Sequence, residues 1–312
     1  MGYVIATANM KGGVGKTTLT VNLATCLAKN HNKRVLVVDL DTQISATLSL
    51  LSPADFAKLR AEKRTLKHLL NRSIKPEAST SLPIQDIIRS YMCTVKGLDL
   101  LPGDIDLYDE FLVSEMLHEK AAKESEHSFE QVWDRFEKSL VRSILQPVIK
   151  DYDFILLDCA PGYNLITRSG IIASDFYLLP AKPEPLSMVG IQLLERRINA
   201  LREKYQSTHP IDVQLLGIVF TMSGGMMVKR YYREVMHRVT EDFSASKIFE
   251  TRIPTDVNVS KAVDSYMPVV LSSPMSSGSK AFIGLTQEFL QKLSMIVGLK
   301  SQTTKMSLIN LE

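Results

Sequence analysis

The feature that most constrains the fold of this chain is the sequence "NMKGGVGKTT", which runs from Asn9 to Thr18. It follows a short apolar run, Tyr3 to Ala8, that is typical of a strand. It precedes apolar residues at helical spacing between Leu19 and Ala28. Glycines in such a loop permit positive φ, so successive backbone N–H groups can converge on an anion at the helix N-terminus. The strand, loop and helix together predict a phosphate-binding loop.

The standard phosphate-loop pattern, G-x-x-x-x-G-K-[ST], is matched only in its second half. Gly15, Lys16 and Thr17 fit it, but Met10 stands where the pattern needs a glycine, and a second lysine, Lys11, follows. Lys16 is expected to reach the β- and γ-phosphates of a nucleotide, and Thr17 to offer its hydroxyl to Mg²⁺. The extra lysine needs a separate explanation.

Short apolar runs rich in β-branched residues recur along the chain, and helical patterns follow them. After Tyr3–Ala8 they lie at Arg34–Val38, Leu98–Leu101, Phe154–Leu157, Phe176–Leu179 and Gln214–Phe220. Continuous rather than alternating apolar strands between helices indicate a parallel sheet that is covered on both faces. The predicted fold class is therefore α/β: a doubly wound, mostly parallel sheet with helices on both faces.

The domain organisation is predicted to be one domain, 1–299, followed by a polar, loosely ordered C-terminal tail, 300–312. Helical insertions are expected near 52–81 and 112–150. The first is basic, because its run from Lys58 to Lys75 meets only one acid, Glu62; the second begins with an acidic half. For both, a solvated helical face is the alternative to a binding surface.

Composition excludes several classes of protein. A net charge of +3 is too small to indicate nucleic-acid binding by itself. The sequence shows no secretory signal, and no apolar run approaches the length of about 20 residues that is needed to span a bilayer. A cytoplasmic location is therefore predicted. The cysteines, Cys26, Cys93 and Cys159, lie far apart without metal-ligand spacing. They are expected to be reduced thiols, mostly in the core.

Three aspartates lie at or just beyond the ends of predicted buried strands, at the sheet edge where open α/β proteins bind ligands. Asp39 and Asp41 would share a face if their strand extends that far. Asp158 follows four apolar residues, as an aspartate presented to Mg²⁺ does. Helix capping or a buried acceptor role stays open for each, most of all for Asp39. With no His or Glu next to these motifs as a strong base, slow hydrolysis is expected.

These motifs resemble the ParA/MinD family of partitioning and positioning ATPases, which carry a deviant Walker A loop. The resemblance extends from Tyr3 to about Leu293, and the helical insertions fit poorly. The turn Cys159–Gly162 also departs slightly from the commoner Pro-Pro pair of the family. The segments that carry the resemblance are "KGGVGKTT", "RVLVVDLDTQ", "TLKHLL", "GLDLLPGDIDL", "YDFILLDCAPG", "LLPAKPEPLSMVGIQLL", "LLGIVFTM" and "IPTDVNVSKAVDSYMPVV".

The resemblance implies ATP and Mg²⁺ as cofactors and assigns roles to residues. In that family two subunits close over two ATP molecules, and the extra lysine, here Lys11, contacts the phosphates bound by the partner. It implies that Asp41 positions the attacking water and that Thr17, Asp39 and Asp158 surround the Mg²⁺. The implied catalytic residues are Lys11, Lys16 and Asp41. The implied nucleotide contacts are Lys11, Gly12, Gly13, Val14, Gly15, Lys16, Thr17, Thr18, Met222, Pro254 and Asp256.

Members of that family bind either nonspecific DNA or, through a C-terminal amphipathic helix, a membrane. The segment "VKRYYREVMHR" contains a basic cluster, namely Lys229, Arg230, Arg233 and Arg238, in a predicted helix. Several phosphate contacts from it would make DNA binding steeply dependent on salt. The basic run Lys58–Lys75 is a second candidate. The apolar positions of Ala281–Val297 predict a helix packed on the sheet, so no stable membrane association is expected.

The predicted function is an ATP-dependent dimerising ATPase that binds nonspecific DNA in its ATP state and partitions or positions a plasmid or chromosome. A small centromere-binding adaptor would stimulate its slow, Mg-dependent hydrolysis, and the protein would associate with the nucleoid. Because the loop begins near Met1, we expect no N-terminal operator-reading domain. Two alternatives stay open: positioning of a protein organelle such as the carboxysome, and a membrane-associated MinD-like role. Metal-cluster carriers and electron-transfer reductase components are disfavoured, because they need cluster-ligating cysteines.

Overall fold

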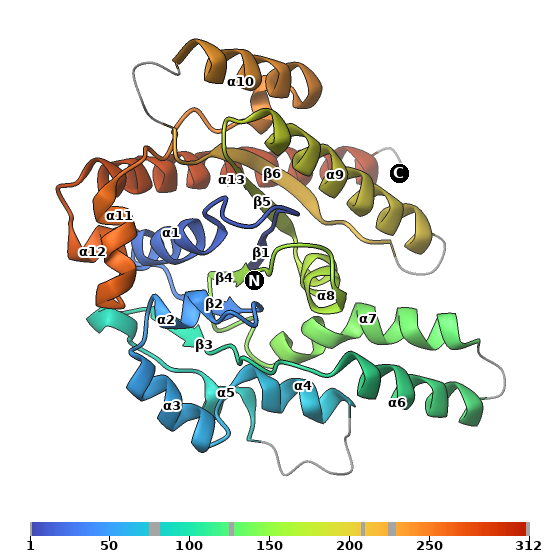
Figure 1. Cartoon of the computed structure of the whole chain (residues 1–312). Helices are drawn as coiled ribbons and strands as arrows, with labels where there is room; N and C mark the ends of the chain where they lie inside the picture. The colour runs from blue at the N-terminus through green and yellow to red at the C-terminus, as the bar shows by residue number, and fades with distance from the viewer. Residues whose placement is uncertain (1, 75–81, 125–127, 207–209, 224–228, 310–312) are drawn as a thin grey trace.

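A computed structural model describes residues 2–74, 82–124, 128–206, 210–223 and 229–309 (Figure 1). Its centre is a six-stranded parallel sheet in the order β3-β2-β4-β1-β5-β6. The strands are β1 (Tyr3–Thr7), β2 (Val35–Asp39), β3 (Leu98–Leu101), β4 (Phe154–Asp158), β5 (Phe176–Ala181) and β6 (Gln214–Phe220). The predicted strands and the predicted fold class are confirmed.

Alternate residues of each strand face two separate cores. In β1, Val4 and Ala6 join one apolar cluster, while Ile5 joins the other. The first face is covered by α4 (Leu66–Ile74), α5 (Ile84–Ile87), α6 (Glu110–Lys123), α7 (Phe129–Leu145), α8 (Leu165–Ala173), α9 (Pro185–Tyr205) and α10 (Lys229–Phe243). The second is covered by α1 (Lys16–His31), α2 (Ser45–Leu48), α11 (Val257–Ala262), α12 (Val269–Ser272) and α13 (Ser277–Ile309).

The two regions predicted as insertions contain helices. The first holds α3 (Pro53–Ala61) and α4, and the second holds the antiparallel pair α6 and α7 (Figure 1). Residues 75–81, which complete the first region, lie outside the described residues.

Acids that are distant in sequence neutralise part of the basic run Lys58–Lys75. Arg60 contacts Asp104 through Nε at 3.3 Å and Asp106 through Nη2 at 2.6 Å, and Lys67 lies 3.6 Å from Asp106. These acids come from the loop after β3, so a count of charges within the run missed them. Because acids of the same chain pair with these cations, the run is better explained as part of the folded surface than as a DNA-binding surface.

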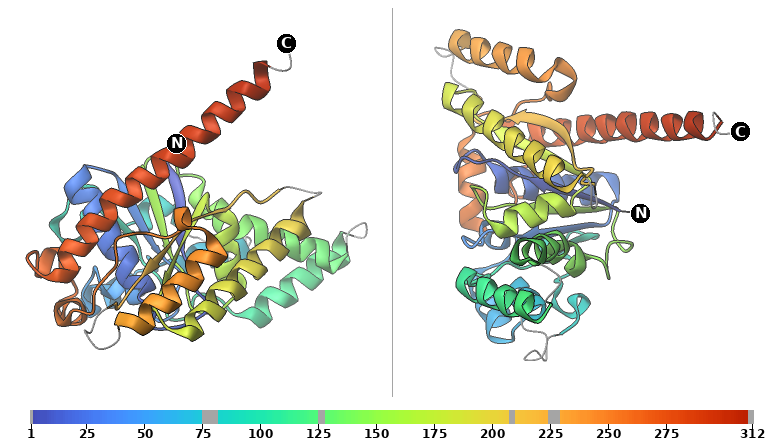
Figure 2. Two further views of the ribbon diagram at one scale, coloured as in Figure 1. Left: turned by 90° about the horizontal axis from the view of Figure 1, so that it is seen from above. Right: turned by 90° about the vertical axis from the view of Figure 1, so that its right-hand side faces the viewer.

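Helix α13 packs its first half on the sheet, as its apolar pattern predicts. Phe282, Leu285 and Phe289 are buried, and the Phe289 ring lies 5.7 Å from that of Phe154. Figure 2 shows the C-terminal half of α13 projecting well beyond the body of the protein. The structure continues α13 to Ile309, and the division into a domain, 1–299, and a polar tail, 300–312, stays a prediction. The sequence after Gly298 offers no glycine or proline that would end it.

The described residues bear on two further predictions from composition. Cys26 and Cys159 are buried and Cys93 is half-buried, all as free thiols, so the prediction that they lie mostly in the core is confirmed. Within the described part of the chain, no helix combines the length and the apolar character that crossing a membrane needs.

Candidate phosphate and magnesium site

The loop between β1 and α1 has the backbone shape of an anion cradle. Gly13 and Gly15 take left-handed φ values of 68° and 83°, and Gly15 is the N-cap residue of α1. A Cβ added at Gly13 would meet no atom within 4 Å, so the space over the loop is open. The unpaired N–H groups of the first turn of α1 therefore have room for a phosphate group beside them.

Two side chains tie this loop to the neighbouring strands. Asn9 donates from Nδ2 to the carbonyl of Pro180 at 2.7 Å and accepts the N–H of Lys11 at 2.9 Å. Thr221, directly after β6, donates its hydroxyl to the carbonyl of Val14 at 2.8 Å. Sequence reasoning missed Asn9 and Thr221, although each is a polar residue just beyond a predicted apolar strand.

Lys16 is a buried cation at the base of the loop. Its ammonium donates to the carbonyl of Lys11 at 3.0 Å, and its residue is 7% exposed. Burial lowers the pKa of Lys16, while the charges of Asp158 and Asp41 raise it. A phosphate in the cradle would stabilise the charged form of Lys16. This agrees with the prediction that Lys16 reaches the phosphates of a nucleotide.

Thr17 and Asp158 form the candidate magnesium site. The Thr17 hydroxyl donates to Oδ2 of Asp158 at 2.7 Å, and Thr20, which sequence reasoning missed, lies 3.2 Å from Oδ1. Burial and the adjacent Asp39 raise the pKa of the fully buried Asp158. Hydroxyl and carboxylate oxygens are the ligands that Mg²⁺ prefers, and a cation would relieve the repulsion between the two carboxylates. These residues therefore fit a magnesium ion.

Asp39 holds the loop that follows β2. It pairs in register with Asp158 on the adjacent strand β4. Its Oδ2 accepts from both the backbone N–H and the hydroxyl of Thr47 at 2.7 Å, and its Oδ1 accepts the N–H of Asp41 at 3.1 Å. Burial raises the pKa of Asp39, while the Thr47 and Asp41 bonds lower it. These contacts favour the buried-acceptor alternative for Asp39, in which it anchors α2 through Thr47, a residue that sequence reasoning missed.

Asp41 lies in the loop and not in the strand. Since β2 ends at Asp39, the condition under which alternation along one strand would align the two carboxylates is not met. Asp41 is 7% exposed and accepts the N–H of Gln43 at 3.0 Å. Its charge acts on both Lys16 and Asp158. The loop therefore brings Asp41 to the same site by a different route.

Lys11 is engaged outside the cradle. Its ammonium lies 3.1 Å from Oε2 of Glu184, and the two side chains are 36% and 41% exposed. Glu184 is the N-cap residue of α9 and was not predicted from sequence, although it lies within a segment that carries the family resemblance. The two lysines of the loop thus occupy different surroundings.

The residues predicted to contact the nucleotide base come from two adjacent segments. The N–H of Ser223, next to Met222, donates to the carbonyl of Ile253, next to Pro254, at 3.0 Å. Because Thr221 contacts Val14, both segments lie beside the phosphate loop.

Asp256 caps two helices. Its carboxylate accepts the N–H groups of Asn258 and Gly278 at 2.8 Å and the Ser277 hydroxyl at 2.9 Å. These bonds lower the pKa of Asp256 to about 2. The starts of α11 and α13 therefore use this carboxylate, and a nucleotide contact stays a prediction.

The predicted DNA-binding cluster lies on α10. The side chains of Lys229, Arg230 and Arg233 are outside the described residues, while Arg238 is exposed. Lys247, a basic residue a little further along the chain, donates to the carbonyl of Leu215 at 2.8 Å. It is therefore used within the fold.

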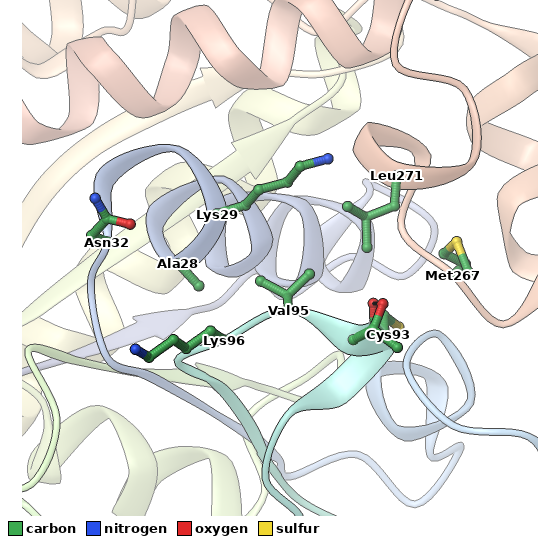
Figure 3. Close-up of a pocket in the computed structure, with 9 residues that line it drawn as sticks. Ala28, Lys29, Asn32, Cys93, Val95, Lys96, Met267 and Leu271 are labelled. Atoms are coloured by element: carbon green, nitrogen blue, oxygen red, sulfur yellow. Dashed lines mark hydrogen bonds between the residues drawn. The ribbon is translucent and has the colours of Figure 1, made fainter.

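Two surface cavities lie away from the phosphate cradle. One, of about 470 Å³, lies at the C-terminal end of α1 (Figure 3). The amino groups of its two lysines, Lys29 and Lys96, point away from each other, so they do not converge on an anion. The other, of about 790 Å³, is lined by Thr42, by residues of α4, and by the loop after β3 together with the start of α6.

Known proteins are similar in sequence to this chain over most of its length. Residues 2–211 match a family model described as an AAA domain. The sporulation initiation inhibitor protein Soj of Bacillus subtilis is 30% identical over 297 residues, which cover 92% of this chain and 98% of Soj. The chromosome partitioning protein ParA of Myxococcus xanthus is 26% identical, over 94% of this chain and 89% of that protein.

Solved structures share the fold. The cell division ATPase MinD of Pyrococcus furiosus superimposes with a TM-score of 0.62 at 23% identity, covering 94% of this chain and 100% of MinD. Cobyrinic acid a,c-diamide synthase of Mycobacterium smegmatis, with bound ADP and magnesium, gives a TM-score of 0.62 at 25% identity, over 85% of this chain and 91% of that one.

Proposed function

Because this chain belongs to the ParA/MinD family of P-loop ATPases, we propose that it is an ATP-driven dimer that partitions or positions DNA. In the proposed cycle, two chains close over two molecules of Mg-ATP, and the dimer binds nonspecific DNA on the nucleoid. A small adaptor on the cargo, a plasmid or chromosome, stimulates hydrolysis and releases the dimer.

The observation that carries this proposal is the different placement of the two lysines. Lys16 is buried under the cradle, whereas the ammonium of Lys11 is half-exposed and paired with Glu184. A cation on the outside of a phosphate site is suited to stabilise γ-phosphate charge on a facing subunit, as an arginine finger does. Lys16 then serves its own nucleotide, and Lys11 serves that of the partner.

The other residues of the site act within one chain. Backbone N–H groups of the loop and Lys16 bind the phosphates, and Thr17 with Asp158 holds the metal. The magnesium ion, when bound, neutralises charge that develops between the phosphates. Asp41 orients the attacking water. Positioning without a strong base gives slow turnover, which suits a timer that waits for a partner.

The proposal that the dimer binds DNA depends on the basic segment of α10 and not on the residues of the phosphate loop. Four basic residues within ten positions, Lys229, Arg230, Arg233 and Arg238, provide enough charge for several phosphate contacts. Such contacts carry no sequence information, which is consistent with binding to bulk chromosomal DNA.

The proposal is tested by electrophoretic mobility shift with a DNA duplex of arbitrary sequence. We expect retention of the DNA with Mg-ATP or a slowly hydrolysed analogue, and none with Mg-ADP or with the Lys16→Ala protein. Retention should fall steeply as salt rises. Equal retention with ADP and with ATP would contradict a nucleotide-gated function.

A further inference from the structure

The segment between β4 and α8 forms a turn beside the phosphate loop. The turn, residues 159–163, directly follows Asp158 of the candidate magnesium site. A Cβ at Gly12 would lie 3.9 Å from Cβ of Pro161. Gly162 takes a left-handed φ of 93°, and a Cβ there would meet no atom within 4 Å. The turn therefore borders the phosphate loop and is open at Gly162.

Hydrogen bonds hold the backbone of this turn at its two ends. The N–H of Cys159 donates to the carbonyl of Thr7 at 3.2 Å. At the other end, Nη1 of Arg168 donates to the carbonyl of Tyr163 at 3.0 Å. Among the described contacts, none is a hydrogen bond to the backbone of residues 160–162. The path of the middle of the turn thus depends on its two ends, and the side chain of Arg168 holds one of them.

Glu137 of α7 fixes the side chain of Arg168. Its Oε1 accepts Nε of Arg168 at 2.6 Å, and its Oε2 accepts the hydroxyl of Tyr205, at the end of α9, at 3.0 Å. The Glu137 side chain is only 3% exposed. Because a carboxylate at this depth is costly to leave unpaired, it holds Arg168 in one orientation. The planar guanidinium then donates to Glu137 and to the carbonyl of Tyr163 at the same time.

This contact connects the second insertion to the phosphate site. Glu137 lies within that insertion, and α7 packs along α8, which carries Arg168 (Figure 1). The insertion is also joined to α9 without Arg168, because Asp134 of α7 pairs with Lys204 at 2.7 Å. Holding the helices together therefore does not by itself explain why a buried carboxylate pairs with Arg168.

We propose that Arg168 and Glu137 are positioning residues for ATP hydrolysis, because they fix the turn 159–163 beside the γ-phosphate. The inference rests on the proposed function, since it assumes that the cradle holds ATP and hydrolyses it. The backbone N–H groups of Ala160 and Gly162 are the donors that the turn presents. Donors fixed before the reaction stabilise charge in the transition state without reorganisation. A loosened turn loses this benefit, whereas binding of ADP, which has no γ-phosphate, is unaffected.

Three variants separate positioning from stability. Arg168→Lys keeps the charge next to Glu137, but it donates from a single atom and cannot reach both acceptors as the two nitrogens of Arg168 do. Glu137→Gln keeps an acceptor and removes the charge. Tyr205→Phe is the matched control, because it removes a hydrogen bond from the same carboxylate and leaves Arg168 in place.

Single-turnover hydrolysis of Mg-ATP, with the protein in excess, measures the rate at the site. The rate should fall by about ten-fold or more in Arg168→Lys and by a smaller factor in Glu137→Gln, and it should stay at the wild-type level in Tyr205→Phe. The double variant of Arg168→Lys with Glu137→Gln should be no slower than Arg168→Lys alone, because Glu137 acts through Arg168. All variants should bind fluorescent ADP as the wild type does.

Hydrogen exchange gives a readout that does not depend on turnover. With magnesium and a slowly hydrolysed ATP analogue, amide exchange of residues 160–163 should slow in the wild type and in Tyr205→Phe. In Arg168→Lys the analogue should not slow it. If thermal unfolding shows that Arg168→Lys is not folded, Glu137→Gln still decides, because its rate and its protection should both fall below those of Tyr205→Phe.

The outcomes separate this inference from the proposed function. A wild-type protein that does not hydrolyse Mg-ATP would refute the proposed function itself. If the wild type hydrolyses ATP, then wild-type rates and protection in both Arg168→Lys and Glu137→Gln would overturn the inference. Equal slowing in Tyr205→Phe would also overturn it, because the contacts would then serve stability alone.

Discussion

The ammonium of Lys11 lies 3.1 Å from the carboxylate of Glu184, while the carbonyl of the same lysine accepts the ammonium of Lys16 at 3.0 Å. One residue thus joins the phosphate loop to the start of α9 and to the buried lysine below it. Both partners of the ion pair are more than one third exposed, so it contributes only about 0 to 1 kcal/mol. A pair this weak holds Lys11 without preventing its transfer to a phosphate.

Replacing Glu184 by glutamine is expected to favour the dimer. In this variant Lys11 does not have to break an ion pair before it contacts the γ-phosphate bound by the partner. The concentration of ATP analogue that gives half-maximal dimerisation should therefore fall by up to about five-fold. Light scattering during a nucleotide titration measures this. The control is Glu203→Gln, at the far end of α9. An increased requirement for nucleotide would mean that Glu184 supports the dimer instead.

Replacing Asp41 by alanine should leave nucleotide binding and dimerisation in place and slow hydrolysis by about a hundred-fold or more. Among the described contacts, the Asp41 carboxylate accepts a hydrogen bond only from the N–H of Gln43, so the fold should persist without it. Phosphate release at saturating ATP gives the rate, and DNA retention should last longer than in the wild type. Turnover at the wild-type rate would remove Asp41 from its proposed role.

Replacing Asp158 by asparagine should remove the magnesium dependence of ATP binding. For the wild type, chelating the metal should weaken binding of a fluorescent ATP analogue by about ten-fold or more, and for the variant it should change little. Burial and Asp39 raise the pKa of Asp158, so its charged form costs folding free energy near neutral pH. The metal-free variant should therefore unfold at the same temperature or higher. Undiminished metal dependence would contradict the assignment.

Charge reversal of Arg230 and Arg233 to glutamate should abolish DNA retention and leave ATP-dependent dimers unchanged. Each lost phosphate contact also lowers the slope of binding against salt by about one. The matched control reverses two exposed basic residues of the first insertion, Lys63 and Arg72. If the control loses DNA and the α10 variant keeps it, the binding surface lies on the insertion.

The sheet and the phosphate loop were predictable because their signals are local. Strand runs such as Phe154–Leu157 and the glycines before Lys16 carry their structure within a few residues. The position of Asp158 followed from the end of its strand. The predicted strand Arg34–Val38 differs from β2 by one residue at each end, since a strand boundary depends on pairing with a neighbour as well as on composition.

The remaining parts of the site depend on residues that are far apart in the sequence. Glu184 meets Lys11 across 173 residues, and Thr221 meets Val14 across 207. Arg60 finds its acids in the loop after β3, 44 and 46 residues away. No window of sequence contains these pairs, so only the three-dimensional arrangement reveals which charges remain for a ligand.

The central claim, that Lys11 acts on the nucleotide of a second chain, is tested most directly by light scattering of the Lys11→Ala protein. With magnesium and a slowly hydrolysed ATP analogue, the variant should bind nucleotide as the wild type does and yet remain monomeric. The Lys16→Ala protein should lose nucleotide binding itself. Wild-type dimers formed by Lys11→Ala at the same nucleotide concentration would contradict the account.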